Sequence, residues 1–279
     1  MRSRLLISAA VAVVGVAAAA PAASGDGGPG PGFAQGWDGI QSGNVRYVAV
    51  PAGGQTALEV IRRNGGRVVR FMTMKGSWGI PLVADDGTTG GLLRDGHTLL
   101  VAGVKYGAIR PKYSTFALVD MKKMRVARKL RIHGDQSFDA LSPDAKYMYL
   151  VEYVSAGDFS RYRVRAYDLR AGRLLRDPVI DKREWETTMQ GYPISRAAPH
   201  QGWVYTLYGG GDHAFIHALD TAHVRAVCID LPWKQPHRLF EFRLRSDGEG
   251  HLVVRGPRGR TLAVVDRTAL RVLSSVRNP

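Results

Sequence analysis

The sequence contains a single cysteine and, after its first 23 residues, no long run with helical hydrophobic periodicity. Since Cys228 is the only cysteine among 279 residues, no intramolecular disulfide can hold the fold together. The missing 3.6-residue apolar period argues against a helical protein and favours an all-β chain. Cys228 lies in the apolar run AVCID, so we expect a buried, inert thiol and not a nucleophile or metal ligand.

Motifs of common catalytic and cofactor sites are also missing. The chain has no HExxH, nucleophile elbow, phosphate-binding loop or dinucleotide-binding fingerprint, and we therefore expect no cofactor and no metal. His213 and His217 share one strand face, but four positions on a strand span about 13 Å, too far for one zinc ion. A binding role is favoured over an enzymatic one, and the question of an enzyme stays open.

Acidic residues are scarce beside basic ones. The chain has 39 Lys and Arg against 24 Asp and Glu, a formal charge of +15. The Arg residues are scattered along the chain and no nucleic-acid-binding module is visible, so nucleic acid is not an expected partner. Two interpretations of the charge remain: it keeps the protein soluble, or it contacts an anionic cell-wall polymer in a salt-sensitive manner. Another envelope protein is the alternative partner.

The N-terminal segment predicts export. Arg2 and Arg4 precede the apolar run Leu5–Ala20, and Ala20-Pro21-Ala22 supplies a small–x–small cleavage pattern. Because the run is shorter than the roughly 20 residues that span a bilayer, we expect cleavage near Ala22 and no stable membrane span afterwards. A retained anchor is the alternative. The expected location is extracellular or cell-wall associated, and the expected divisions are a signal peptide (1–23), a Gly/Pro-rich linker that could add a closing strand (24–44) and a folded domain (45–279).

Five segments of the chain share one pattern, an apolar strand, a short polar turn and a second apolar strand. They are Leu58–Val69, Phe116–Ala127, Val164–Leu175, Ile216–Val227 and Leu262–Leu273. Four have Asp at the start of the turn (Asp120, Asp168, Asp220 and Asp266), and all five have Arg five positions after that point. The spacings between these Asp residues, 48, 52 and 46, are typical of the four-stranded units of a β-propeller.

The segments between these hairpins supply the other two strands of each unit. A turn and an apolar strand precede each hairpin, and the short runs Ser137–Ser142, Tyr192–Ala197 and Leu239–Arg245 precede three of those strands. We therefore predict an all-β propeller with five blades of four antiparallel strands, six blades being the alternative. The first blade lacks an obvious inner strand, which Phe33–Ile40 would have to supply.

The repeats resemble a known class of propellers. The segment Leu141–Leu175 (LSPDAKYMYLVEY…YRVRAYDLRAGRLL) resembles the YVTN and WD40-like units of secreted bacterial β-propellers. Gly76–Gly91, Met189–Ala197 and His217–Trp233 resemble blocks of an uncharacterised group of exported actinobacterial-type propellers. The resemblance implies the scaffold and carries no activity.

Candidate functional residues lie where the repeat breaks down. We expect the repeated Asp and Arg to be structural, since Asp at a turn commonly accepts backbone hydrogen bonds; a shared rim of positive charge at the repeated Arg is the alternative. A propeller binds ligands at the mouth of its channel, where we place Asp85, Asp86, Asp139, Arg196 and Arg243. These side chains could bind a small polar ligand or a cation, or they could fill the axis with salt bridges and water. The insertion Asp177–Gly191 is the predicted recognition loop, with Glu184, Trp185 and Glu186 at its centre.

Together these observations predict a secreted, non-catalytic β-propeller that acts as a binding module of the cell envelope. One alternative is a hydrolase or lyase that acts on a polar envelope substrate at the channel mouth. The other is an envelope sensor or assembly factor that binds a protein.

Overall fold

The computed structural model describes residues 33–34, 39–104, 111–155, 158–234, 238–277 and 279. Regular structure in this part of the chain consists of β-strands and two short 3₁₀ turns, and no helix there is long and apolar enough to cross a membrane. The strands form five consecutive sheets, each built on four antiparallel strands. The predicted five-bladed, all-β architecture is thus confirmed, whereas the predicted signal peptide lies outside the described residues.

Each blade uses four strands in chain order, from an inner strand to an outer one. Blade 1 consists of β2 (Gly39–Ser42), β3 (Val45–Ala52), β4 (Gln55–Arg62) and β5 (Val68–Lys75). Blade 2 consists of β6 (Trp78–Pro81), β7 (Thr98–Gly103), β8 (Tyr113–Asp120) and β9 (Arg125–His133). Blade 3 consists of β10 (Gln136–Leu141), β11 (Tyr147–Tyr153), β12 (Arg161–Asp168) and β13 (Arg173–Leu174).

The last two blades follow the same order. Blade 4 consists of β15 (Tyr192–Arg196), β16 (Trp203–Gly209), β17 (Phe215–Asp220) and β18 (Arg225–Asp230). Blade 5 consists of β19 (Arg243–Ser246), β20 (His251–Arg255), β21 (Thr261–Asp266) and β22 (Arg271–Ser275). Two short strands are additional: β1 (Phe33–Ala34) pairs with β6, and β14 (Met189–Gln190) pairs with β12. The 3₁₀ turns are η1 (Leu239–Glu241) and η2 (Pro257–Gly259).

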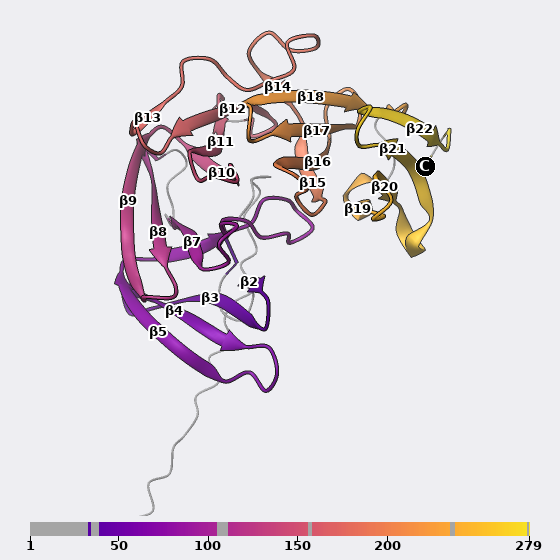
Figure 1. Cartoon of the computed structure of the whole chain (residues 1–279). Helices are drawn as coiled ribbons and strands as arrows, with labels where there is room; N and C mark the ends of the chain where they lie inside the picture. The colour runs from indigo at the N-terminus through magenta and orange to yellow at the C-terminus, as the bar shows by residue number, and fades with distance from the viewer. Residues whose placement is uncertain (1–32, 35–38, 105–110, 156–157, 235–237, 278) are drawn as a thin grey trace, which may run out of the picture.

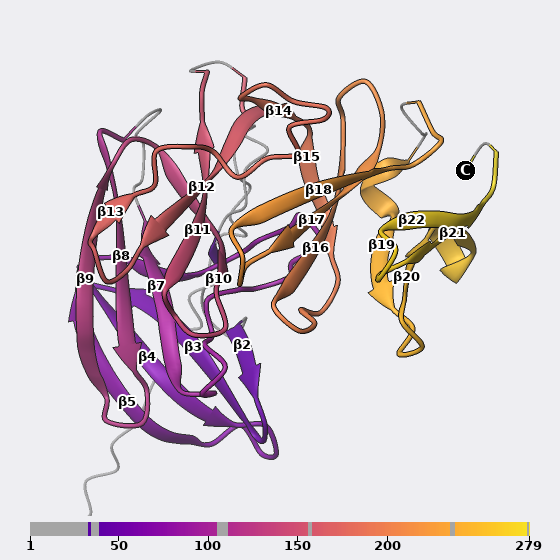
Figure 2. The ribbon, with the colours of Figure 1, turned by 45° about the horizontal axis from the view of Figure 1, so that its top comes forward.

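The blades follow one another along an arc, with blade 1 at one end and blade 5 at the other (Figures 1 and 2). Four apolar cores lie between successive blades, and none of the cores in the described part of the chain joins blade 5 to blade 1. The exposed large apolar side chains belong to these two end blades: Val68, Phe71, Phe240 and Leu273. The apolar packing that stabilises the fold therefore lies between blades that follow one another in the sequence.

The repeated turn explains why the outer hairpins form. In blade 2, the Asp120 carboxylate accepts hydrogen bonds from the backbone N–H groups of Lys122 and Lys123, at 3.0 and 2.9 Å. The fourth residue after the Asp adopts a left-handed conformation, as Met124 does with φ of 50°, which costs energy for a residue with a Cβ atom. The same pairing of an acceptor Asp with a left-handed residue recurs in blades 3, 4 and 5 at Asp168/Gly172, Asp220/Val224 and Asp266/Leu270. These Asp residues thus have the structural role expected of them.

Inner strands differ most from the sequence-based expectation. In blade 2 the inner strand is β6, which lies within Gly76–Gly91, whereas the sequence predicted no short inner run for this blade. In blade 5 the expected strand Leu239–Arg245 begins with the turn η1, and β19 starts only at Arg243. In blade 1 the inner strand is β2, which lies within the 24–44 division expected to add a closing strand but shares only Gly39 and Ile40 with the expected inner-strand segment Phe33–Ile40. Four-residue apolar runs carry too little periodicity to fix such boundaries.

The insertion of blade 3 also differs from the expectation. It does not follow a complete fourth strand, because β13 has only two residues and pairs with one end of β12. Backbone hydrogen bonds from Leu175 to Ala166 and from Val179 to Val164 continue along β12, and β14 then pairs with its other end. The residues between Val179 and Met189 therefore leave and rejoin the outer edge of the blade.

Candidate functional site

The segment Leu82–Gly91, which follows β6, crosses the middle of the arc and contacts blade 4. The backbone N–H groups of Asp85 and Asp86 donate to the carbonyls of Pro193 and Ile194 on β15, at 2.8 and 3.1 Å. In Figure 1 this loop lies between β7 and β15. A segment expected to bind a ligand therefore ties non-adjacent blades together at the axis.

Asp86 and its neighbour Asp85 have different environments. The Asp86 side chain is 2% exposed; its carboxylate accepts from the Ser195 hydroxyl at 2.6 Å and from the backbone N–H and hydroxyl of Thr88. Asp85 is exposed, and no side-chain hydrogen bond to it occurs in the described part of the chain. Partial desolvation, followed by the charge of Asp86, raises the pKa of the Asp85 carboxyl to about 6.

Asp139 and Arg196, two of the predicted channel residues, form a buried ion pair. Their side chains, on β10 and β15, are 4% and 6% exposed. The guanidinium contacts the Asp139 carboxylate, donates to the Asp139 carbonyl at 2.6 Å, and donates through Nε to the Thr206 hydroxyl at 2.9 Å. This pair fits the alternative in which salt bridges fill the axis.

Arg243 does not join this pair through any hydrogen bond in the described residues. It lies at the start of β19, and its guanidinium donates to the backbone carbonyls of Phe240 and Phe242 at 3.0 and 2.9 Å. The neighbouring Arg245 is the cation nearest Asp86, at 3.8 Å. The five predicted channel residues thus separate into a buried pair, a loop anchor, an exposed carboxyl and an arginine bound to its own segment.

A cavity of roughly 550 Å³ opens beside the ion pair. Residues of blades 1 to 4 line it, among them Phe138, Leu141 and Pro143, with Asp139 and Arg196 in its wall. Its volume lies within the usual range of small-molecule sites. The lining is mainly apolar, the two charges of Asp139 and Arg196 bond each other, and the exposed Arg94 also lines the cavity.

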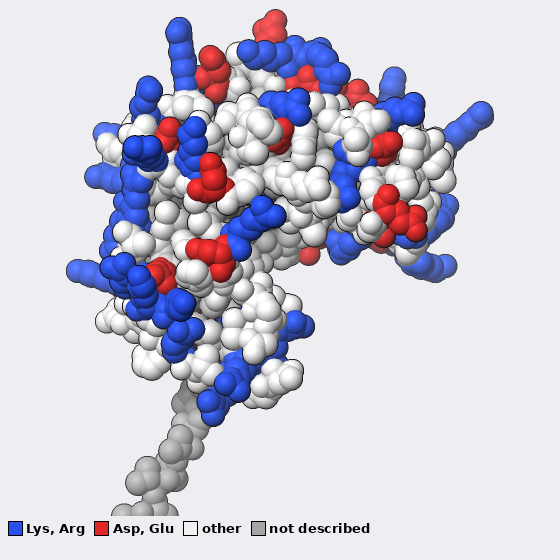
Figure 3. Space-filling model, in the orientation of Figure 1, with Lys and Arg blue, Asp and Glu red and all other residues white. Residues whose placement is uncertain are grey.

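A basic surface covers the outer strands of blades 1 and 2, and we call it the basic rim. Its residues are the exposed Lys and Arg of two segments: Arg62, Arg63, Arg67, Arg70, Lys75, Lys122, Lys123, Arg125, Lys129 and Arg131. The only carboxylate of those segments (62–75 and 120–133) is Asp120, which bonds its own turn. None of the ten cations is ion-paired within the described residues, and Lys and Arg gather at the left edge of Figure 3, where Figure 1 places β9 and β5.

The recognition-loop residues lie against blade 4. Glu184 and Glu186 are exposed, and the partly buried Trp185 packs on Phe215 of β17 with ring centroids 6.1 Å apart. Asp181 anchors the loop by accepting a hydrogen bond from the backbone N–H of Cys228 at 2.9 Å. Cys228 is buried in β18, and burial raises the pKa of its thiol, as expected of an inert cysteine.

Sequence reasoning anticipated one feature of these surfaces only in part and missed another. A shared rim of positive charge at the repeated Arg residues was the alternative to a structural role, but the grouping of the basic residues on blades 1 and 2 was not predicted, because the alignment of β5 with β9 on one side of the molecule depends on blade packing. Sequence reasoning also missed Ser195, which links Asp86 to blade 5 by accepting from the Leu244 N–H at 2.8 Å. The high density of Lys and Arg in residues 62–75 and 120–133 was the signal from which the basic rim could have been predicted.

Comparison with known proteins identifies the fold alone. No family model matches the chain, and no curated protein matches it. Among solved structures, it is similar to Kuenenia stuttgartiensis hydrazine synthase, with 18% identity and a TM-score of 0.51 over 80% of this chain and 68% of that one. It is also similar to the dihydro-heme d1 dehydrogenase NirN, with 12% identity and a TM-score of 0.50 over 85% of this chain and 45% of that one.

A third similar structure is the propeller of Dos1, with 12% identity and a TM-score of 0.48 over 84% of this chain and 59% of that one. Two of these neighbours are enzymes by name. Because one propeller scaffold serves many activities, neither reaction is carried over to this chain.

Proposed function

We propose that the protein is an exported, non-catalytic binding module of the cell envelope that holds an anionic polymer on its basic rim. The observation that supports this proposal most directly is the group of ten exposed cations on the outer strands and turns of two adjacent blades, none of which has an ion pair in the part of the chain that the structure describes. A cluster of one sign of charge raises the local concentration of an oppositely charged polymer and accelerates its association.

The arrangement of the rim suits a long ligand better than a small one. Its cations lie on the outer strands and their turns, away from the cavity near the axis, and none of them forms an ion pair with a carboxylate in the described residues. Phosphate- or carboxylate-bearing polymers present repeated charges that can contact several of these side chains together. Such binding depends on exposed charges and is therefore weakened by salt.

The state of the channel residues supports a binding role over catalysis. Asp139 and Arg196 neutralise each other, and Asp86 is committed to Ser195 and Thr88. A general acid or base must reach a substrate with its titrating group. These three side chains bond within the fold, and Asp85 alone among the five predicted channel residues presents an exposed carboxyl. The N-terminal sequence supports export, through the apolar run after Arg2 and Arg4.

The proposal is tested by measuring the affinity of the full chain for long-chain polyphosphate at increasing salt. Lys123→Glu/Arg125→Glu reverses two charges on the basic rim, and Arg258→Glu/Arg260→Glu reverses two exposed charges on blade 5. At low salt we expect the first variant to bind roughly tenfold more weakly or worse, since each cation near an anionic surface contributes about 1 kcal/mol. The blade 5 variant, which has the same net charge, should change little.

Equal losses in the two variants would show that net charge alone acts, and would overturn the assignment to the basic rim. Retention of polyphosphate that does not depend on salt would overturn the electrostatic mechanism. Export is tested separately by sequencing the N-terminus of protein recovered outside the cells, where a start close to residue 23 is expected and an intact Met1 contradicts cleavage.

A further inference from the structure

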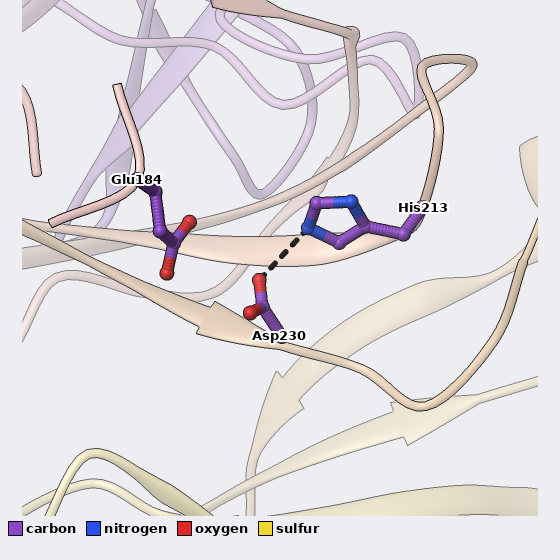
Figure 4. Close-up of side chains that lie close together, drawn as sticks. All are labelled: Glu184, His213 and Asp230. Carbon is purple, nitrogen blue, oxygen red and sulfur yellow. Dashed lines mark hydrogen bonds and ion pairs between the residues drawn. The ribbon is translucent and has the colours of Figure 1, made fainter. Parts of the chain in front are cut away.

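Three side chains of types that can ligate a metal ion meet at one end of blade 4, and they come from separate segments. Glu184 comes from the insertion, His213 from the turn between β16 and β17, and Asp230 from the end of β18. One donor atom of each lies within 4.8 Å of the other two, and His213 Nε2 is 2.8 Å from Asp230 Oδ1. Figure 4 shows the carboxylate of Asp230 between the Glu184 carboxylate and the His213 ring.

The surrounding contacts hold these donors in place. Phe215 packs against both His213 and Trp185, with ring centroids 5.7 and 6.1 Å apart, so one ring positions the histidine and the neighbour of Glu184. Asp181 fixes the same loop to the backbone of Cys228, two residues before Asp230. It also accepts from the Trp185 N–H through its carbonyl, at 3.0 Å. The donors therefore converge without relying on a bound ion.

The cluster has an excess of negative charge. Glu184 and Asp230 are both carboxylates, and His213 is the one basic side chain among the three donors. The nearby Arg183 bonds the Asp181 carboxylate at 2.6 Å. In the described part of the chain, no Lys or Arg forms an ion pair with Glu184 or Asp230. A divalent cation would supply the missing positive charge.

A second group of similar composition shows the contrast. Asp247, Glu249 and His251 also lie close together, but all three belong to one turn of five residues. There the Asp247 carboxylate accepts from the backbone N–H groups of Glu249 and His251 and contacts the His251 ring. Local turn formation accounts for that group, whereas the Glu184 group joins positions far apart in sequence.

We propose that Glu184, His213 and Asp230 form a binding site for a divalent transition-metal ion such as Zn²⁺, which fastens the insertion to blade 4. Imidazole nitrogen and carboxylate oxygen are ordinary zinc donors at about 2.0–2.2 Å, and tetrahedral binding places neighbouring donors about 3.3 Å apart. The donors need only small movements to reach this geometry. Three protein ligands leave a coordination position for water, on the exposed side of Glu184 and Asp230.

This site does not depend on the proposed binding of a polymer, because it lies on blade 4 and the basic rim lies on blades 1 and 2. Its test uses tag-free full-length protein, treated with a chelator and titrated with ZnCl₂ against a chromophoric zinc indicator. We expect one equivalent of zinc to bind, and a rise in the melting temperature of the zinc-loaded protein. His213→Ala and Glu184→Gln should each lower the affinity roughly tenfold or more, as even outer-shell changes do at zinc sites.

His251→Ala is the matched control, since it removes a histidine from the local turn and should leave the zinc affinity and the melting-temperature shift unchanged. All of these side chains are exposed or partly exposed, so the variants are expected to fold, which their apo melting temperatures check. The proposal would be overturned if His213→Ala bound zinc as tightly as wild type. It would also be overturned if His251→Ala lost zinc binding while His213→Ala and Glu184→Gln kept it.

Discussion

The hydroxyl of Ser195 donates a 2.6 Å hydrogen bond to Asp86, a residue 109 positions earlier in the chain. Ser195 also accepts from the Leu244 N–H, so this pair connects the loop of blade 2 with the inner strands of blades 4 and 5. In an arc whose apolar cores join only successive blades, such a contact across the axis links blades that are not neighbours in sequence.

Removing either partner should destabilise the fold, and the two effects should be coupled. Asp86→Ala deletes the acceptor of Ser195 and Thr88, for an expected loss of about 1.5–3 kcal/mol, because hydrogen bonds to charged groups have that range. Ser195→Ala should cost about 1.5–3 kcal/mol, because it removes a hydrogen bond to a charged group and leaves the Leu244 N–H without its acceptor. Urea unfolding of the single and double variants measures the coupling. If the double variant lost the full sum of the two effects, the contact would not be a stabilising one.

The next prediction concerns Asp85 and pH. Its pKa is raised from 3.8 to about 6 in the folded protein, so ionisation of this carboxyl opposes folding. Below about pH 4 the carboxyl is protonated in both the folded and the unfolded state, and it does not lower the stability of the fold. The loss of stability develops between pH 4 and 6 and is complete above pH 6. Asp85→Asn is therefore expected to be more stable than wild type at pH 8 and equally stable at pH 4.

The pH series for Asp85→Asn is measured by urea unfolding at each pH. Asp86→Asn serves as its control, because Asp86 accepts three hydrogen bonds and its replacement should destabilise the protein at pH 8. A stability difference between wild type and Asp85→Asn that is constant from pH 4 to 8 would contradict the raised pKa.

The outer hairpins could be predicted from sequence because their information is local. The Asp at the start of each turn, the left-handed residue four positions later and the alternating strands lie within about a dozen residues, as Asp266, Leu270 and Arg271 illustrate. The inner strand Trp78–Pro81 has only four residues, and its role depends on pairing with β7 and β1. The outer hairpins could be predicted because their signals lie close together in sequence. The inner strand could not, because it is defined by its pairing with other strands in the folded protein.

The candidate site was less accessible to sequence reasoning. Asp139 and Arg196 could be placed on inner strands, but their direct pairing across 57 positions depends on how blade 3 meets blade 4. His213 and Asp230 were not connected, since one precedes β17 and the other ends β18, and only the β17–β18 hairpin brings them together. A pattern within one segment cannot reveal a site whose side chains come from several segments.

The buried pair of Asp139 and Arg196 gives the sharpest stability prediction. Asp139→Ala leaves the buried guanidinium without its carboxylate and is expected to cost about 3–5 kcal/mol. Arg196→Met leaves the carboxylate buried alone, with a similar cost. Because both desolvated charges disappear together in Asp139→Leu/Arg196→Met, the double variant should be closer to wild type than either single variant. Urea unfolding of the four proteins measures this, and a double variant that is less stable than both single variants would show that the two charges do not depend on each other.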